Sequence, residues 1–134
     1  MKAADSSVVV AAFASWHEHH DRARDALDHG LRLIDHCALE TYSVLTRLPA
    51  PHRCPSDVVR DFLRLRFDEP FLRLDARAYK TFVLDLPEHA IAGGGAYDAL
   101  VAATAVAHRA RLITCDRRAA SVYEAYGVRA TYLG

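Results

Sequence analysis

The amino-acid sequence predicts an α/β fold of three layers, α/β/α, in which helices cover both faces of a central parallel sheet. Short apolar stretches typical of strands alternate with longer stretches whose apolar residues recur at helical spacing. One or two helices separate consecutive strand stretches, so right-handed crossovers between parallel strands are the economical connection. Of the 134 residues, 51% are apolar and 25% are charged, which is the balance of a folded domain. We expect residues 1–134 to form one domain.

The sheet is expected to contain about four to five strands. The first of them is short and polar for a buried strand, and it ends at Asp5. In chain order the strand stretches are KAA (2–4), LRLID (31–35), FLRLD (71–75), RLITC (111–115) and VRATYL (128–133).

Helices are expected between these strands. The stretch 17–30 carries an apolar stripe and ends at Gly30, a natural helix stop. The stretch 36–48 must end before Pro49, and 54–67 begins with a Pro-Ser-Asp start signal. Three glycines lead into the helix of GGGAYDALVAATA (93–105), and they are expected to let the chain turn sharply. The other helical stretches are SSVVVAAFAS (6–15), DARAYKTFVLDL (75–86) and RRAASVYEAYG (117–127).

Four carboxylates fall near the carboxyl ends of the predicted strands. Asp5 follows the first strand and Asp116 follows RLITC. Asp98 lies in the first turn of the helix that leads into RLITC, and Glu40 lies in the helix after the second strand. In parallel sheets this edge is where ligands bind. Four carboxylates in one cleft repel unless a cation neutralises them, and oxygen ligands of this kind suit Mg²⁺ or Mn²⁺.

Each carboxylate also has a structural alternative, which the sequence leaves open. Asp5 and Asp116 are both well placed to cap the helix that follows them. Glu40 lies on a helix stripe that is compatible with an ordinary solvated side chain. The structural alternative is weakest for Asp98, because burying an unpaired carboxylate is unfavourable. Its neighbours on the same helix face are Val101, Ala102 and Ala105.

Several other types of site have weaker support. The stretch GGGAYD lacks the GK[ST] of a P-loop and the third glycine of a dinucleotide fingerprint. Zinc binding by His17, His19 and His20 beside Asp21 is a possible alternative, although a solvated helix face is favoured.

Composition restricts the partners and the compartment. The formal net charge is zero, so no overall basic field attracts nucleic acid or anionic lipid. Cys37, Cys54 and Cys115 form no CxxC pair, which favours a reduced, cytoplasmic protein. No stretch has the length of a membrane span.

Four segments hold the acidic residues. They are AADSSVVVAAF with Asp5, CALETYSVLTRLPAPHR with Glu40, AYDALVAATAVAH with Asp98, and RLITCDRRA with Asp116. In their order and spacing, and over essentially the whole chain, they resemble the PIN-domain ribonucleases, and within that family the VapC toxins of bacterial toxin–antitoxin pairs. The second and third segments are the specific ones.

This resemblance implies a PIN-like fold with an acidic pocket that binds Mg²⁺ or Mn²⁺ and cleaves RNA endonucleolytically with metal-activated water. By resemblance, Asp5 and Asp98 are metal ligands, and Glu40 and Asp116 complete the catalytic set of carboxylates. We expect Asp116 to hold the ion as well, and Glu40 to position the attacking water. Polar support for these carboxylates is expected from Ser6 and Thr114.

The resemblance also implies partners. A cognate VapB-type antitoxin would lie along an apolar groove and obstruct the site, and homodimers are common in the family. The chain departs from the family pattern in its weak first strand and in Arg117-Arg118, where many relatives carry an acidic or amide residue. We therefore assign no second metal position, and the two arginines are candidates for contact with RNA phosphate. The alternatives are a PIN-like module that binds RNA or a partner without cutting, and a structure-specific DNA nuclease.

Overall fold

The computed structural model describes residues 1–134 and confirms the predicted α/β architecture. Four parallel strands form one sheet in the order β2-β1-β3-β4. The strands are β1 (Lys2–Ala4), β2 (Arg32–Leu33), β3 (Arg111–Thr114) and β4 (Ala130–Tyr132). The α-helices are α1 (Ser6–Phe13), α2 (His20–Asp28), α3 (Asp35–Thr46), α4 (Ser56–Arg66), α5 (Ala76–Asp85), α6 (Gly95–Ala107) and α7 (Ala120–Ala125). A short 3₁₀ turn, η1 (Leu86–His89), follows α5, and another, η2 (Arg117–Ala119), precedes α7.

The short first strand forms as predicted and occupies an interior position in the sheet. Ala3 is paired with Arg32 of β2 on one side and with Leu112 of β3 on the other. Ala3 and Ala4 are fully buried. Hydrogen-bonded neighbours on both sides therefore hold a strand that is only three residues long.

The predicted strand over 71–75 is absent, and this part of the prediction is wrong. Only Leu72 approaches the sheet: its N–H donates to the Leu33 carbonyl at 2.8 Å and its carbonyl accepts from Asp35 N–H at 2.9 Å. Pro70 precedes this stretch and has no N–H to donate. At its other end, Asp75 caps α5 by accepting from Ala78 N–H at 2.8 Å. Leu72 pairs only as an isolated bridge with Ile34, so this stretch adds no strand to the sheet.

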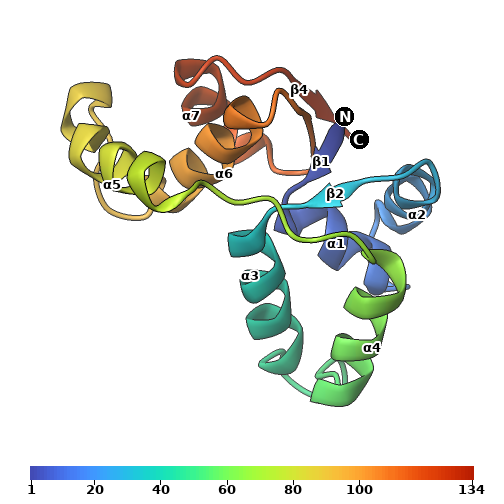
Figure 1. Ribbon diagram of the computed structural model, residues 1–134. Coiled ribbons are helices and arrows are strands. Elements are labelled where there is room, and N and C mark those ends of the chain that lie inside the picture. The colour runs from blue at the N-terminus through green and yellow to red at the C-terminus, as the bar shows by residue number, and fades with distance from the viewer.

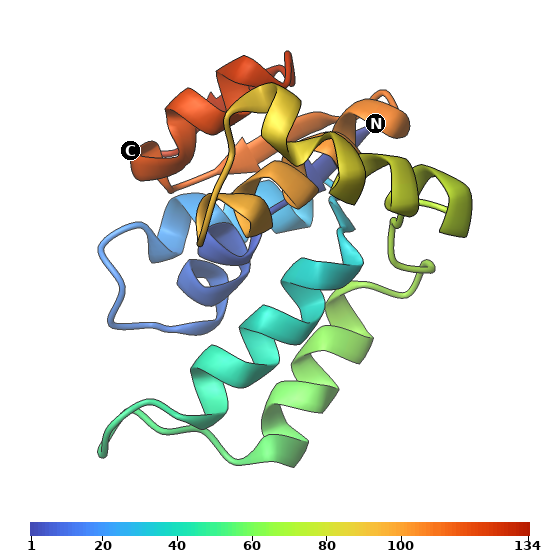
Figure 2. The same cartoon turned by 90° about the vertical axis from the view of Figure 1, so that its left-hand side faces the viewer.

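The helices lie on both sides of the sheet (Figure 1). The β1–β2 connection carries α1 and α2, whereas α6 packs on β3 from the side on which α7 also lies. Figure 2 shows α3 and α4 as a pair of neighbouring helices that extends away from the sheet, with Leu45 and Val59 fully buried. None of the helices combines the length and apolar composition that crossing a membrane requires.

The strand order places a topological switch point between β1 and β3. From β1 the chain continues to β2 on one side, and from β3 it continues to β4 on the other side. Crossover connections that diverge in this way leave a crevice at the carboxyl ends of the two strands. Asp5 directly follows β1, and Asp116 lies two residues beyond the end of β3, so both residues stand at this crevice.

Candidate active site

A pocket of about 280 Å³ lies at the carboxyl ends of β1 and β3. All four carboxylates predicted from the sequence line it, together with the predicted supporting residue Ser6. Thr114, the other predicted supporting residue, is fully buried beneath the pocket and contacts Asp5. The acidic residues are Asp5, Glu40, Asp98 and Asp116, and the other lining residues are Ser6, Ser7, His36, Gly94, Tyr97, Val101, Arg118 and Tyr123.

The Asp5 carboxylate joins four elements of the fold. Its Oδ1 accepts hydrogen bonds from Ser7 N–H at 3.1 Å, Ser7 Oγ at 2.5 Å and Val8 N–H at 3.4 Å. Its Oδ2 accepts from Thr114 Oγ1 at 2.5 Å and Tyr123 OH at 2.9 Å. The carboxylate that follows β1 is therefore held by donors from α1, β3 and α7.

Asp5 is both the N-cap of α1 and a pocket residue, so the two interpretations of the sequence describe one geometry. The residue is 3% exposed. Burial raises the pKa of the Asp5 carboxyl above its usual value, while its hydrogen bonds to Ser7, Thr114 and Tyr123 act in the opposite direction. These hydrogen bonds therefore stabilise the charged carboxylate and offset part of the desolvation penalty of burying it.

Asp98 and Asp116 share one cation, the guanidinium of Arg118. Arg118 Nη1 lies 3.3 Å from Asp98 Oδ2, and its Nη2 lies 2.9 Å from Asp116 Oδ2. The Asp98 side chain is only 16% exposed, and its burial raises its pKa although Arg118 opposes the shift. Asp116 also caps η2, accepting from Arg118 N–H at 3.1 Å.

Glu40 turns toward the pocket and is not a freely solvated side chain. Ser6 Oγ, expected by resemblance to support the carboxylates, donates a hydrogen bond to Glu40 Oε1. His36 Nε2 lies 3.5 Å from Glu40 Oε2, at the outer limit of hydrogen bonding. The contact with His36 lowers the pKa of Glu40, and the contact with Glu40 raises the pKa of His36.

Four pocket residues have contacts that sequence reasoning did not identify. Ser7 and Tyr123 hold Asp5, Arg118 pairs with two acids, and His36 contacts Glu40 while its ring stacks on Tyr97. The i,i+4 spacing of His36 and Glu40 is visible in the sequence and was the one available signal. Tyr123 lies 118 residues from Asp5, and no local pattern indicates such a contact.

The histidines considered for zinc make local contacts. His17 Nδ1 accepts from His19 N–H at 3.1 Å, and His20 Nδ1 lies 2.9 Å from the Ala11 carbonyl oxygen. With the side chains as they stand, no three acidic, histidine or cysteine residues converge closely enough to form a metal site. The donor chemistry of the acidic pocket nevertheless fits a cation, because Asp98 and Asp116 already bind the guanidinium of Arg118 together.

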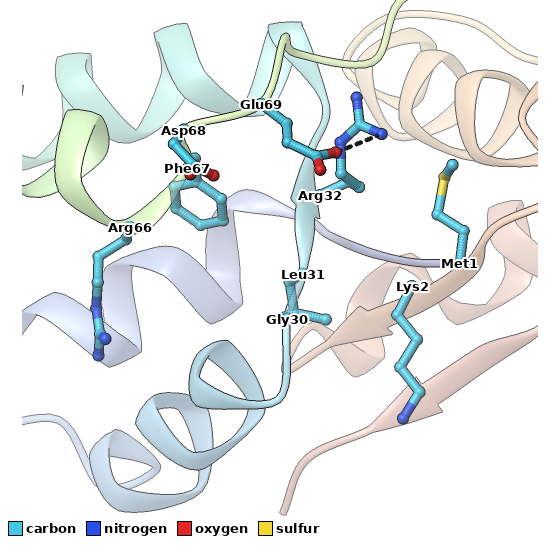
Figure 3. Close-up of a pocket in the computed structure, with 9 residues that line it drawn as sticks. All are labelled: Met1, Lys2, Gly30, Leu31, Arg32, Arg66, Phe67, Asp68 and Glu69. Atoms are coloured by element: carbon cyan, nitrogen blue, oxygen red, sulfur yellow. Dashed lines mark ion pairs between the residues drawn. The ribbon is translucent and has the colours of Figure 1, made fainter.

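A second pocket, of about 290 Å³, lies around the amino ends of β1 and β2 and differs in its charges (Figure 3). Lys2, Arg32 and Arg66 lie here with Asp68 and Glu69. Arg32 Nη1 is paired with Glu69 Oε2 at 3.0 Å, the ion pair drawn in Figure 3. Of these two pockets, only the one at the carboxyl ends gathers an excess of carboxylates.

Replacing Asp5 tests whether its hydrogen bonds hold the site together. Asp5→Ala removes a cap and leaves the buried donors Thr114 and Tyr123 without their acceptor, so we expect a loss of about 2–4 kcal/mol in the free energy of unfolding. Asp5→Asn keeps an acceptor oxygen and removes the buried charge, so the change should stay within about 1 kcal/mol. Urea denaturation followed by circular dichroism measures both.

Asp75→Ala is the matched control, because it removes a cap from α5 at an exposed position and should lower the free energy of unfolding by only about 0.5–2 kcal/mol. Equal destabilisation by Asp5→Asn and Asp5→Ala would contradict the assignment, since the charge would then matter more than the hydrogen bonds.

The His36–Glu40 pair predicts a defined pH dependence. The pKa of His36 is raised, so its contribution to stability is present below about pH 6.5 and is lost as the pH rises through the raised value. The pKa of Glu40 is lowered, so its contribution is present above about pH 4.5 and is lost as the pH falls through the lowered value. The pair is therefore most stabilising between these two pH values.

NMR titration of the His36 ring should give a pKa above 6.5 that falls toward that ordinary value in Glu40→Gln. Glu18→Gln, at an exposed side chain outside the pocket, should leave the His36 titration unchanged. A His36 pKa that does not respond to Glu40→Gln would rule out the pair.

Comparison with known proteins supports the resemblance. The model of the PIN domain family matches residues 3–125. Ribonuclease VapC40 of Mycobacterium tuberculosis (strains CDC 1551 / Oshkosh and ATCC 25618 / H37Rv) is 50% identical over 124 residues, which are 92% of this chain and 92% of that protein. Ribonuclease VapC27 of M. tuberculosis H37Rv is 43% identical over 119 residues, 88% of this chain and 79% of that protein.

A solved structure supports the fold independently. The crystal structure of FitAcB from Neisseria gonorrhoeae superposes with a TM-score of 0.69 and covers 97% of this chain and 96% of that one. At 20% sequence identity this likeness concerns the fold alone. The family match and the two mycobacterial relatives concern the sequence, and the family match over residues 3–125 includes all four acidic residues. The chain therefore belongs to the PIN-domain family and is a homologue of the VapC ribonucleases.

Proposed function

We propose that this chain, as one nuclease domain over residues 1–134, is a Mg²⁺- or Mn²⁺-dependent endoribonuclease and the toxin of a type II toxin–antitoxin pair. The observation that carries the proposal is the convergence of four carboxylates on one pocket at the switch point of a parallel sheet. The homology to VapC ribonucleases supports RNA as the polymer that is cut.

The four carboxylates have different surroundings and therefore different proposed roles. Asp5, Asp98 and Asp116 hold the divalent ion. When bound, the ion lowers the pKa of a coordinated water and offsets charge on the phosphodiester in the transition state. Glu40 orients the attacking water and accepts its proton.

The supporting residues fix these carboxylates in place. Ser6 Oγ donates to Glu40, which leaves Oε2 of that carboxylate facing His36. Thr114 Oγ1 donates to Asp5 and also accepts from Asp116 N–H at 2.9 Å, so one hydroxyl connects two of the proposed ligands. Loss of either hydroxyl should therefore loosen the position of a carboxylate without removing it.

Arg118 is proposed to change partners during the reaction. Its guanidinium pairs with Asp98 and Asp116, two of the carboxylates proposed to hold the ion. The side chain is 73% exposed, so it is free to swing outward when the ion takes its place. A guanidinium released at the edge of the pocket is suited to bidentate contact with an RNA phosphate.

Substitution of Asp98 tests the proposed metal mechanism. Purified chain should cleave an unstructured RNA in the presence of Mg²⁺ or Mn²⁺, and EDTA should abolish the reaction. Asp98→Asn should lower the cleavage rate by at least about 100-fold, because it removes a charged ligand from the site. Asp25→Asn, at a side chain 76% exposed on α2, is the matched control and should cleave normally.

Three results would contradict this proposal. RNA cleavage that survives both Asp98→Ala and EDTA would exclude the metal mechanism. Equal or faster cleavage of a DNA strand of matched sequence would favour the structure-specific DNA nuclease. RNA binding without any cleavage in Mn²⁺ would favour the non-catalytic binding module.

A toxin that acts on cellular RNA should arrest growth unless a partner blocks its site. The proposed partner is a cognate VapB-type antitoxin, and the proposed compartment is the cytoplasm, which the three free cysteines support. Induced expression of the chain in a bacterial host should stop growth, whereas Asp98→Asn should not. Co-expression of the antitoxin should restore growth and yield a complex on affinity purification. Growth arrest by the Asp98→Asn variant would argue against RNA cleavage as its cause.

The chain is also proposed to form a homodimer. No residue of α5 is buried in the single chain. Three of its apolar or aromatic side chains are well exposed: Tyr79 at 49%, Val83 at 41% and Leu84 at 65%. An exposed apolar helix face of this kind is a common feature of association surfaces. Native mass spectrometry of the purified chain gives the stoichiometry directly.

A further inference from the structure

Two aromatic rings form a parallel stack at the edge of the catalytic pocket. The rings of Tyr97 and His36 lie with centroids 5.3 Å apart and planes inclined by only 8°. Tyr97 belongs to the first turn of α6, directly before Asp98, and His36 belongs to the first turn of α3. Both residues line the pocket that holds the four carboxylates. The stack therefore joins the two helices that carry Asp98 and Glu40.

The stack is asymmetric in its exposure. Tyr97 is 59% exposed, whereas the side chain of His36 is only 20% exposed. His36 stacks with an offset against the tyrosine ring, and the high exposure of Tyr97 means that the chain leaves much of this ring uncovered. Large aromatic rings normally bury much of their surface. Packing alone thus leaves the position of Tyr97 unexplained.

The histidine of the stack also has a neighbour among the four carboxylates. Glu40 contacts His36 Nε2 at 3.5 Å, and Glu40 is itself held by Ser6. Another exposed aromatic ring, Trp16, lies beside His52 at 4.5 Å, but its ring is inclined by 41° and neither residue lines the catalytic pocket. A preorganised ring loses little conformational entropy when a flat ligand binds to it.

We propose that Tyr97, backed by His36, is a stacking platform for an unpaired base of the RNA next to the phosphodiester that is cut. This inference rests on the proposed ribonuclease function and adds to it a substrate contact. Unpaired bases stack on aromatic side chains in single-stranded RNA recognition. A base inside a duplex is already stacked on both faces, so the platform selects single-stranded or looped RNA. Stacking of this kind tolerates different bases.

A fluorescent base analogue tests the platform directly. The probe is an unstructured oligouridylate of about 12 nucleotides with one central 2-aminopurine, whose fluorescence falls when it stacks on an aromatic ring. Binding is measured in an Asp116→Asn background to prevent cleavage, since Asp116 forms no contact with either ring. We expect quenching on binding, the same quenching with Tyr97→Phe, and loss of most of it with Tyr97→Ala. Affinity should fall about tenfold in Tyr97→Ala.

Trp16→Ala is the matched control, because it removes another exposed ring that lies beside a histidine, and it should quench like the parent. Circular dichroism checks that each variant is folded. The proposal is overturned if Tyr97→Ala quenches and binds like the parent, if Tyr97→Phe loses as much as Tyr97→Ala, or if Trp16→Ala loses as much as Tyr97→Ala. A duplex that carries the same analogue should show no difference between the parent and Tyr97→Ala.

Cleavage by the chain without substitutions separates this proposal from the proposed function. If that chain cleaves RNA and Tyr97→Ala leaves quenching intact, only the stacking platform is wrong. If the chain neither cleaves RNA nor binds the probe, both proposals fail together.

Discussion

The site depends on one buried interaction, the hydrogen bonding of the Asp5 carboxylate. A carboxylate offers about four lone-pair positions, and here five donor groups from Ser7, Val8, Thr114 and Tyr123 point at its two oxygens. These donors fix the end of β1, the start of α1, the end of β3 and one face of α7 relative to one another. The same carboxylate faces the pocket. Fold and site therefore share a single group, and truncation of Asp5 to alanine would disturb both.

The other acidic residues of the pocket are balanced in a similar way, since each of them has a hydrogen-bonding or charged partner within the chain. Asp5 has uncharged donors, Glu40 has Ser6 and His36, and Asp98 and Asp116 have Arg118. Without such partners, four carboxylates around a pocket of about 280 Å³ would repel one another. The partners differ in how easily they leave. Donors buried under Asp5 are fixed by packing, whereas Arg118 is exposed and exchangeable. A divalent ion held by Asp5, Asp98 and Asp116 would therefore compete with Arg118 at the last two carboxylates and with hydrogen-bond donors at Asp5.

Much of the fold and the position of the acidic pocket could be predicted from the sequence, because both depend on local pattern and connectivity. Alternating strand and helix stretches predicted the parallel sheet, and the residues after strand ends predicted where the carboxylates converge. The strand at FLRLD was predicted wrongly, because a local apolar pattern does not show which residues find partners in the sheet, and only Leu72 does. The roles of Tyr123 and Arg118 could not be predicted either. Both depend on contacts between elements, and Asp5 and Tyr123 lie 118 residues apart.

The first turn of α6 explains how one short stretch can serve two purposes. Gly93, at φ +60°, makes the turn into the helix, a conformation that side chains other than glycine rarely adopt. Because successive helical residues project about 100° apart, Asp98 faces the carboxylates while Tyr97 projects toward His36 on α3. The contact between His36 and Glu40 then ties this aromatic stack to the acidic group proposed to orient water. A base stacked on Tyr97 would hold the adjacent phosphate near the carboxylates, so the adjacency of Tyr97 and Asp98 in this turn would link recognition of the RNA to its cleavage.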